Sequence, residues 1–228
     1  MPVVNRENIV IVALDTASPL VLCEVSVGNR LVFTKRSRIA STVADVPPLL
    51  LEALNSASVM PMDVGVYCVV TGPGPSWTGL RVGATLAKTL AFAAGAEVLG
   101  VPLLKFIAEV FAIGEAAVTV VTRPKPGHIL GASFDATASP VRELTDTFAG
   151  SDEAAAIHFA TAPLVLWYSD ELAPSWFAGT VRSVRHAEVP HGALASVAYS
   201  SWLAGGSSNP HGLIADYAGG PSDWEGRR

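Results

Sequence analysis

The carboxylate of Asp15 is the first side chain in this sequence whose position could support chemistry. It ends the apolar run IVIVAL and precedes the turn-forming residues TASP. A carboxylate that ends a buried strand can hold a metal ion against the phosphates of a nucleotide. We therefore treat Asp15 as a candidate nucleotide-facing residue.

The segment VVTGPGPSWTGLRVG contains a glycine- and proline-rich loop. A phosphate cradle needs consecutive backbone N–H groups, and Pro73 and Pro75 have none to give. The loop also lacks the Lys-Ser/Thr pair that ends a nucleotide-binding P-loop. The sequence therefore predicts a stiff, preformed loop rather than a phosphate site. Its motif residues are Gly72, Gly74, Ser76, Thr78, Gly79 and Gly83.

Histidine and cysteine are too scattered to predict a metal site. His186 and His191 have Pro190 between them, so they do not share one helical turn as paired ligands would. Cys23 and Cys68 each lie inside an apolar run and form no CxxC pair. The sequence also lacks a GxSxG nucleophile elbow. We expect no metal ion, no cofactor and no catalytic residues.

Charge and hydropathy narrow the class of protein further. The chain has 228 residues, is 50% hydrophobic and carries a formal net charge of -5. This charge gives no overall basic field that would attract nucleic acid. No apolar run reaches the roughly 18 residues of a membrane span, and no signal-peptide pattern opens the chain. We expect a soluble, cytoplasmic protein without a membrane partner.

The elements that would position these residues follow a regular order. Three strands are expected at residues 8–19, 20–27 and 30–37, with a hairpin turn at Gly28 and Asn29. The order β-β-β-α-β-α-β-α is that of a ribonuclease-H-like lobe. After the three strands come a helix at 41–57, a strand at 64–72, a helix ending at Gly95, a strand at 97–102 and a helix at 103–114.

The second half of the chain is an imperfect repeat of this order. We expect strands at 117–123, 128–136 and 141–148, a helix at 152–159, strands at 163–169 and 180–189, and a helix at 192–206. The prediction is an α/β protein with the two-lobed actin-like fold, a duplicated ribonuclease-H-like fold with mixed sheets. Its N-terminal lobe spans 1–104, and a smaller, diverged C-terminal lobe spans 105–228. The alternative is one mixed α/β domain.

An enzyme of this fold needs an acid from each lobe to hold a metal-bound phosphate. The second-lobe turn reads VTRPKPGH and offers Arg123 and Lys125 instead of an acid. The helix after the loop is rich in Ala, Gly and Thr, and Gly79 and Gly83 share one of its faces. Such a face suits either close packing on the protein's own sheet or a partner helix.

The stretches ALDTASPLVLCEVSV and VTGPGPSWTGLRVGATLAKTLAFAAGAEVLGVPLL resemble the bacterial TsaB (YeaZ) family, which is glycoprotease-like in its older classification. The family has LDT at the end of its first strand, then a motif close to GPGSFTGLRIG. The C-terminal GLIADYAGGPSDW resembles the tail of the family. The likeness is strong for residues 9–104 and weak for 115–190.

This resemblance implies an actin-like fold without its own catalytic site. The family acts as partner of a related catalytic subunit, TsaD, together with the ATPase TsaE. The complex places threonylcarbamoyl on the adenosine beside the anticodon in tRNA. The resemblance further implies a homodimer when the partner is absent, and only indirect contact with tRNA.

The family docks through its first helix and the helix after TGLR. We therefore expect a partner-docking face formed by Val46, Leu49, Leu50, Leu80, Arg81, Ala84 and Lys88. Three motif positions depart from the family pattern, namely Thr42, Pro75 and Arg123.

The leading hypothesis for the function is a non-catalytic scaffold subunit. The alternative is a stand-alone small ATPase or kinase that uses Asp15. A protease is supported by no zinc-binding helix and no nucleophile with a base.

Overall fold

The computed structural model describes residues 6–18, 20–38, 41–111, 114–177, 181–206 and 209–215. The chain divides into two compact units. The first comprises Met1–Thr71, Ser76–Val101 and Pro190–Ala215, and the second comprises Gly72–Pro75, Pro102–Val189 and Asp216–Arg228. The part of the family-like tail from residue 216 onward lies outside the described residues.

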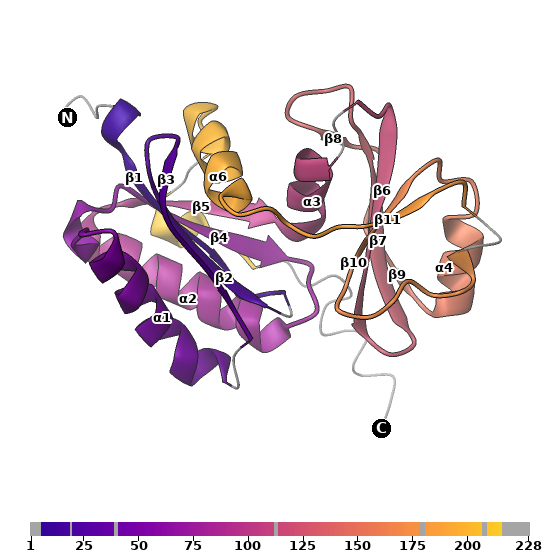
Figure 1. The fold of residues 1–228 in the computed structure, drawn as a ribbon, viewed down its shortest axis with the longest axis horizontal. Coiled ribbons are helices and arrows are strands. Elements are labelled where there is room, and N and C mark those ends of the chain that lie inside the picture. Colours follow the sequence, from indigo (N-terminus) through magenta and orange to yellow (C-terminus); the bar gives the residue numbers. More distant parts are fainter. Residues whose placement is uncertain are drawn as a thin grey trace. The chain divides into compact units, whose positions relative to one another are not determined.

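The first unit contains a five-stranded sheet of order β3-β2-β1-β4-β5 (Figure 1). Strands β1 and β2 pair antiparallel, as do β2 and β3, whereas β1 and β4 pair parallel. This arrangement is the predicted ribonuclease-H-like one. The strands are β1 (Val10–Asp15), β2 (Val21–Val27), β3 (Arg30–Ser37), β4 (Val66–Gly72) and β5 (Glu97–Pro102).

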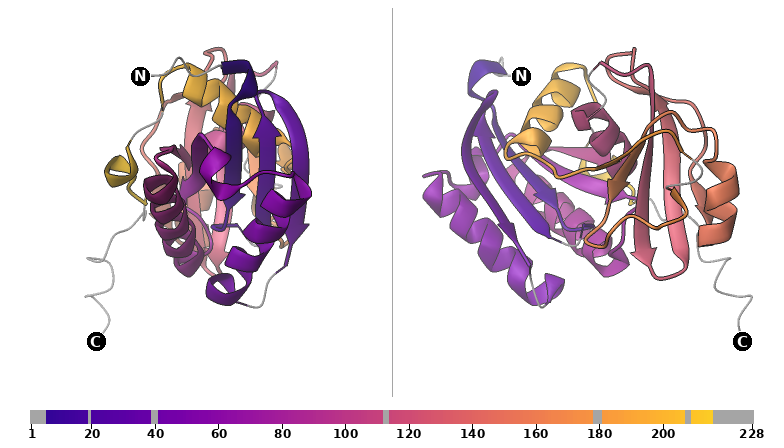
Figure 2. Two further views of the ribbon diagram at one scale, coloured as in Figure 1. Left: turned by 90° about the vertical axis from the view of Figure 1, so that its left-hand side faces the viewer. Right: turned by 45° about the vertical axis from the view of Figure 1, so that its right-hand side comes forward.

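Helices cover both faces of this sheet (Figure 2). On one face α1 (Thr42–Ser56) and α2 (Trp77–Ala94) lie side by side, and on the other lies α6 (Ala193–Leu203). Ser41 and Ser76 cap the first two helices, and Gly95 ends α2 with a left-handed φ of 66°. Short 3₁₀ turns are η1 (Arg6–Asn8), η2 (Pro61–Asp63) and η3 (Pro210–Gly212).

The second unit repeats this strand order, which confirms the predicted duplication. Its sheet runs β11-β10-β6-β7-β8, and β9 also pairs with β7. The β6–β7 pair is antiparallel and the β6–β10 pair parallel, like their counterparts in the first unit. The elements are α3 (Leu103–Phe111), β6 (Ala117–Lys125), β7 (His128–Asp135), β8 (Arg142–Glu143), β9 (Phe148–Gly150), α4 (Asp152–His158), β10 (Val165–Tyr168) and β11 (Val184–His186).

The later strands are shorter than the sequence predicts. The expected strand at 141–148 is two short strands, β8 and β9, and the expected strand at 180–189 shrinks to β11. The last helix of each half of the chain packs on strands other than the one that precedes it in sequence. Helix α3 follows β5 but contacts β6, β7 and β10, and α6 follows β11 but contacts β1 and β2. Residues 190–215, placed by sequence order in the second lobe, therefore have their contacts in the first unit.

Candidate functional site

Asp15 is buried at the end of β1 and is occupied by its own turn. Its side chain is 2% exposed, and one oxygen accepts hydrogen bonds from the N–H groups of Ala17 at 2.9 Å and Ser18 at 3.1 Å. The other oxygen accepts a short hydrogen bond from the Ser18 hydroxyl. Burial raises the pKa of Asp15 above its ordinary 3.8, against the opposing effect of these hydrogen bonds. The Asp15 carboxylate thus shapes this turn and is almost closed to solvent.

The glycines of the TGLRVG motif let α2 approach the same turn. The Thr16 hydroxyl donates to the carbonyl of Gly79 at 2.7 Å. A Cβ on Gly79 would lie 1.7 Å from the Thr16 carbonyl oxygen, and one on Gly83 would lie 2.2 Å from its hydroxyl. Side chains at these two positions would therefore push the helix off the sheet. Of the other motif residues, Gly72 and Gly74 are buried, Ser76 is half-buried and caps α2, and Thr78 is exposed.

The residues expected at the partner surface divide into two groups. Arg81 is exposed, and Lys88 is half-buried with its Nζ donating to the Leu213 carbonyl at 3.1 Å. The other five are at most 8% exposed and lie in the core of the first unit: Val46, Leu49, Leu50, Leu80 and Ala84. Any direct partner contact on these helices therefore falls mainly to their neighbours.

Those neighbours carry large exposed apolar side chains. Val43 and Leu51 on α1 are 64% and 54% exposed, and Phe92 on α2 is 72% exposed. Met60 and Met62, at η2 beside α2, are 65% and 61% exposed. We call these five residues, together with Arg81, the helical face. The five apolar residues were not predicted from the sequence, because the apolar stripe of α1 was assigned to the partner surface rather than to the core. The missed signal was Val43 and Leu51, two turns apart and beside that stripe.

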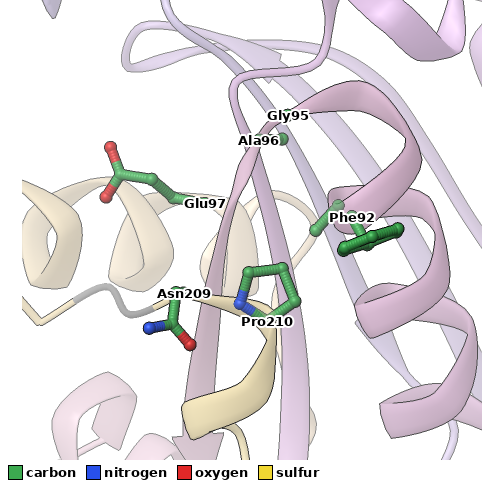
Figure 3. Close-up of a pocket in the computed structure, with 7 residues that line it drawn as sticks. Phe92, Gly95, Ala96, Glu97, Asn209 and Pro210 are labelled. Carbon is green, nitrogen blue, oxygen red and sulfur yellow. The ribbon is translucent and has the colours of Figure 1, made fainter.

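An open groove of about 450 Å³ lies at the C-terminal end of α2 (Figure 3). One wall comes from the end of α2 and the start of β5, and the other from Asn209 and Pro210 at the start of η3 (Figure 3). The lining residues are Ala91, Phe92, Gly95, Ala96, Glu97, Asn209 and Pro210. Phe92 belongs to both the groove and the helical face.

In the second unit, Arg123 occupies the position that Asp15 has in the first. Asp15 follows Leu14, whose parallel partner is Val69, and Arg123 follows Thr122, whose parallel partner is Tyr168. The guanidinium of Arg123 pairs with Asp152 at 2.7 Å and Glu171 at 3.1 Å. It also lies 5.6 Å from the ring centroid of Trp167. A positive charge thus stands in β6 at the position equivalent to Asp15, and both of its carboxylate partners lie in the second unit.

Other kinds of site find little support in the described residues. They include no group of three or more His, Cys, Asp or Glu side chains that could hold a metal ion. Cys23 and Cys68 are unpaired and buried, and burial raises the pKa of Cys23 to about 12, so it is not a reactive thiolate at neutral pH. No described helix is both long enough and apolar enough to cross a membrane.

The chain is similar to proteins of tRNA modification. A family model described as TsaD, tRNA N6-adenosine threonylcarbamoyltransferase, matches residues 40–138. The tRNA threonylcarbamoyladenosine biosynthesis protein TsaB of Bacillus subtilis (strain 168) is 39% identical over 61 residues. That match covers 27% of this chain and 26% of the relative. The sequence-based resemblance to the TsaB (YeaZ) family is confirmed by this match.

Solved structures extend the likeness to the whole fold. A Pseudomonas aeruginosa protein, described as uncharacterized with similarity to peptidase YEAZ, superposes with a TM-score of 0.74 at 19% identity. YeaZ from Pseudomonas aeruginosa superposes with a TM-score of 0.69 at 17% identity. Each match covers 92% of this chain and 99% of the other. The predicted actin-like α/β fold is therefore confirmed.

Proposed function

We propose that this chain takes part in tRNA threonylcarbamoyladenosine biosynthesis as a non-catalytic scaffold subunit. In this proposal it docks to a TsaD-like catalytic subunit and activates it, with a TsaE-like ATPase completing the machinery. The chain contacts tRNA only indirectly and forms a homodimer when it is alone. The relatives reported above support the pathway, while the partners and the activation are inferred.

The observation that carries this proposal is the helical face. It places five large apolar side chains, each more than half exposed, on two adjacent helices and the turn beside them. Large exposed apolar side chains on neighbouring elements are typical of a protein-binding site. The exposed cation Arg81 lies on the same helix as Phe92 and adds a group that can select a partner by charge.

The strand ends of the two units support a role without catalysis. In the first unit the Asp15 carboxylate is used by residues 17 and 18 of its own turn. In the second unit Arg123 stands at the equivalent position and pairs with two carboxylates. Nucleotide hydrolysis by this fold needs two acids that face one metal-bound phosphate. These two positions provide only one acid.

The docking proposal is tested by binding to the TsaD-like protein of the same organism, measured by calorimetry. Leu51→Asp puts a charge into the apolar face, and Arg81→Glu reverses its cation. Each should weaken the complex at least about tenfold, because hot-spot residues of an interface carry 2 kcal/mol or more. The matched control is Leu172→Asp in the second unit, where the leucine is 91% exposed. Unchanged affinity in both face variants would refute docking through this surface.

The stand-alone ATPase or kinase is tested on the isolated chain. It requires saturable Mg-ATP binding that is lost in Asp15→Asn. The scaffold proposal expects no ATP hydrolysis by the chain alone, and an Asp15→Asn variant that still binds the TsaD-like partner.

A further inference from the structure

Helix α1 contains two adjacent prolines beyond its first turn. Pro47 and Pro48 are the sixth and seventh residues of this 15-residue helix. The N–H of Asp45 already donates to the Ser41 carbonyl at 2.9 Å, so helical hydrogen bonding begins before the prolines. A proline in the first turn removes only an N–H that has no partner in the helix, whereas a proline after it removes a hydrogen bond. The packing of the buried side of α1 keeps the helix intact despite this loss.

The prolines deprive two backbone carbonyls of α1 of their usual donors. In an α-helix the carbonyl of residue i accepts from the N–H of residue i+4, or from that of i+3 in a tightened turn. The Val43 carbonyl loses its i+4 donor at Pro47, and the Ala44 carbonyl loses both its i+3 and its i+4 donor. A carbonyl oxygen carries partial negative charge and has two lone pairs that accept hydrogen bonds. This turn of α1 therefore presents acceptors whose usual donors the helix lacks.

These carbonyls lie on the exposed side of α1, beside residues of the helical face. Helix α1 covers one face of the first sheet, and its other side is turned away from the sheet (Figure 1). Val43, Ala44, Pro47 and Pro48 are all exposed. Val43, Pro47 and Leu51 follow one another at four-residue spacing, which places them in one row along the helix. A partner that covers Val43 and Leu51 therefore also covers the carbonyls beside the prolines.

We propose that the TsaD-like partner donates the N–H groups of an arginine, asparagine or glutamine side chain to the Val43 and Ala44 carbonyls. In the free chain water hydrogen-bonds to these carbonyls, and an apolar surface that docks on Leu51 removes this water. Covering an acceptor without replacing its hydrogen bond costs free energy, so apolar contacts alone are unfavourable at this turn.

The chemistry of the donor follows from the two acceptors. An ionised carboxylate has no proton to donate and is repelled by the partial negative charge of the oxygens. A planar guanidinium or amide group instead offers at least two N–H donors, which can serve neighbouring carbonyls together. The inference rests on the proposed function for the identity of the partner, whereas the kind of side chain comes from Pro47 and Pro48.

The first test restores the missing donors. Pro48→Leu keeps an apolar side chain and supplies an N–H to the Ala44 carbonyl, and Pro47→Leu does the same for the Val43 carbonyl. Each variant should raise the free energy of unfolding in urea titrations, because leucine is a strong helix former and proline is not. Each should nevertheless weaken the complex with the TsaD-like protein about tenfold in calorimetry, because the partner's donor loses its acceptor. The matched control is Pro163→Leu, at an exposed position of the second unit, which should leave the affinity unchanged.

The second test observes the carbonyls directly. The deuterated chain, labelled with ¹³C and ¹⁵N, is titrated with the unlabelled TsaD-like protein and followed by NMR. The carbonyl resonances of Val43 and Ala44 should move downfield on binding, as expected for a carbonyl that gains a hydrogen bond. The carbonyls of α6, on the opposite face of the sheet, are the internal control. With the partner labelled instead, the side-chain N–H that becomes protected from exchange distinguishes a guanidinium from an amide.

The outcomes separate this inference from the proposed function. A complex that forms without the carbonyl shifts, or that both leucine variants leave equally strong, overturns the inference and leaves docking through the helical face intact. Weaker binding of the leucine variants without the carbonyl shifts also overturns it, because the loss then comes from the shape of the helix. If the unaltered chain forms no complex, the docking itself is refuted, and this inference with it.

Discussion

Two buried carboxylates in the first unit, Asp15 and Glu24, illustrate how far a side chain's type can mislead about its role. Both are acids on strands, and both accept hydrogen bonds from backbone N–H groups. Glu24 has no exposed surface and accepts from Gly192 at 2.6 Å and from Ala195 at 2.9 Å. It thereby caps α6, whose own N-cap residue, Gly192, has no side chain for the purpose. Asp15 was predicted from the sequence to be a candidate nucleotide-facing residue, whereas no role was predicted for Glu24.

These carboxylates give stability a definite pH dependence. Burial raises the pKa of Asp15 above 3.8 and that of Glu24 above 4.5. The folded state therefore binds more protons than the unfolded state between the ordinary and the raised values. Their contribution is fully present below the ordinary pKa values and is lost as pH rises through the raised ones. Urea titrations at successive pH values should show this fall, and it should be smaller in Asp15→Asn and Glu24→Gln. An identical pH profile in both variants would contradict this assignment.

Gly79 gives a prediction about packing. A methyl group there would overlap the Thr16 carbonyl oxygen, 1.7 Å from the added Cβ. Gly79→Ala should therefore lower the free energy of unfolding by about 3 kcal/mol or more, although alanine is the better helix former. Chemical denaturation measures the loss. Thr85→Ala on the exposed side of α2 is the control and should change stability by less than about 0.5 kcal/mol.

At the scale of elements, the first unit was largely predictable and the later elements were not. Residues 9–37 form three strands because β-branched, apolar runs alternate with clear turn residues, as at Gly28. The strand expected at 141–148 breaks beside Ser133 of β7, whose N–H donates to the Thr145 hydroxyl at 3.0 Å rather than continuing the backbone ladder. The packing of α6 on the first sheet depends on a carboxylate 168 positions away from Gly192, and no local pattern could indicate it. Periodicity likewise found the buried stripe of α1 but could not say what covers it.

Helix α6 should depend on Glu24 for its first turn. Glu24→Ala leaves two N–H groups of the buried helix start without their acceptor, which costs about 1–3 kcal/mol per group. Hydrogen exchange should then accelerate about tenfold or more at the start of α6, while amides of β4 stay protected. Glu188→Ala, at an exposed position, serves as the control. A uniform acceleration through both elements would instead mean general destabilisation.

At the scale of the whole molecule, duplication supplied two similar sheets whose strand ends then diverged. The first sheet carries Asp15, whose carboxylate accepts hydrogen bonds within its own turn. The second carries Arg123, which forms ion pairs with Asp152 and Glu171. The duplicated order was visible in the sequence because each copy begins with apolar strand runs. The packing of α6 on the first sheet was not visible, because a helix with an apolar face does not encode which sheet it covers.

The central claim is that this chain activates a catalytic partner without performing chemistry itself. The most direct measurement is an in vitro modification assay with the TsaD-like protein, a TsaE-like ATPase, unmodified tRNA, Mg-ATP and a threonylcarbamoyl donor. Mass spectrometry of the digested tRNA reports the modified adenosine. The account predicts product only when this chain is added, near-complete loss with Leu51→Asp, and retention with Asp15→Asn if that variant is folded. Equal product without the chain, or loss confined to a folded Asp15→Asn variant, would contradict it.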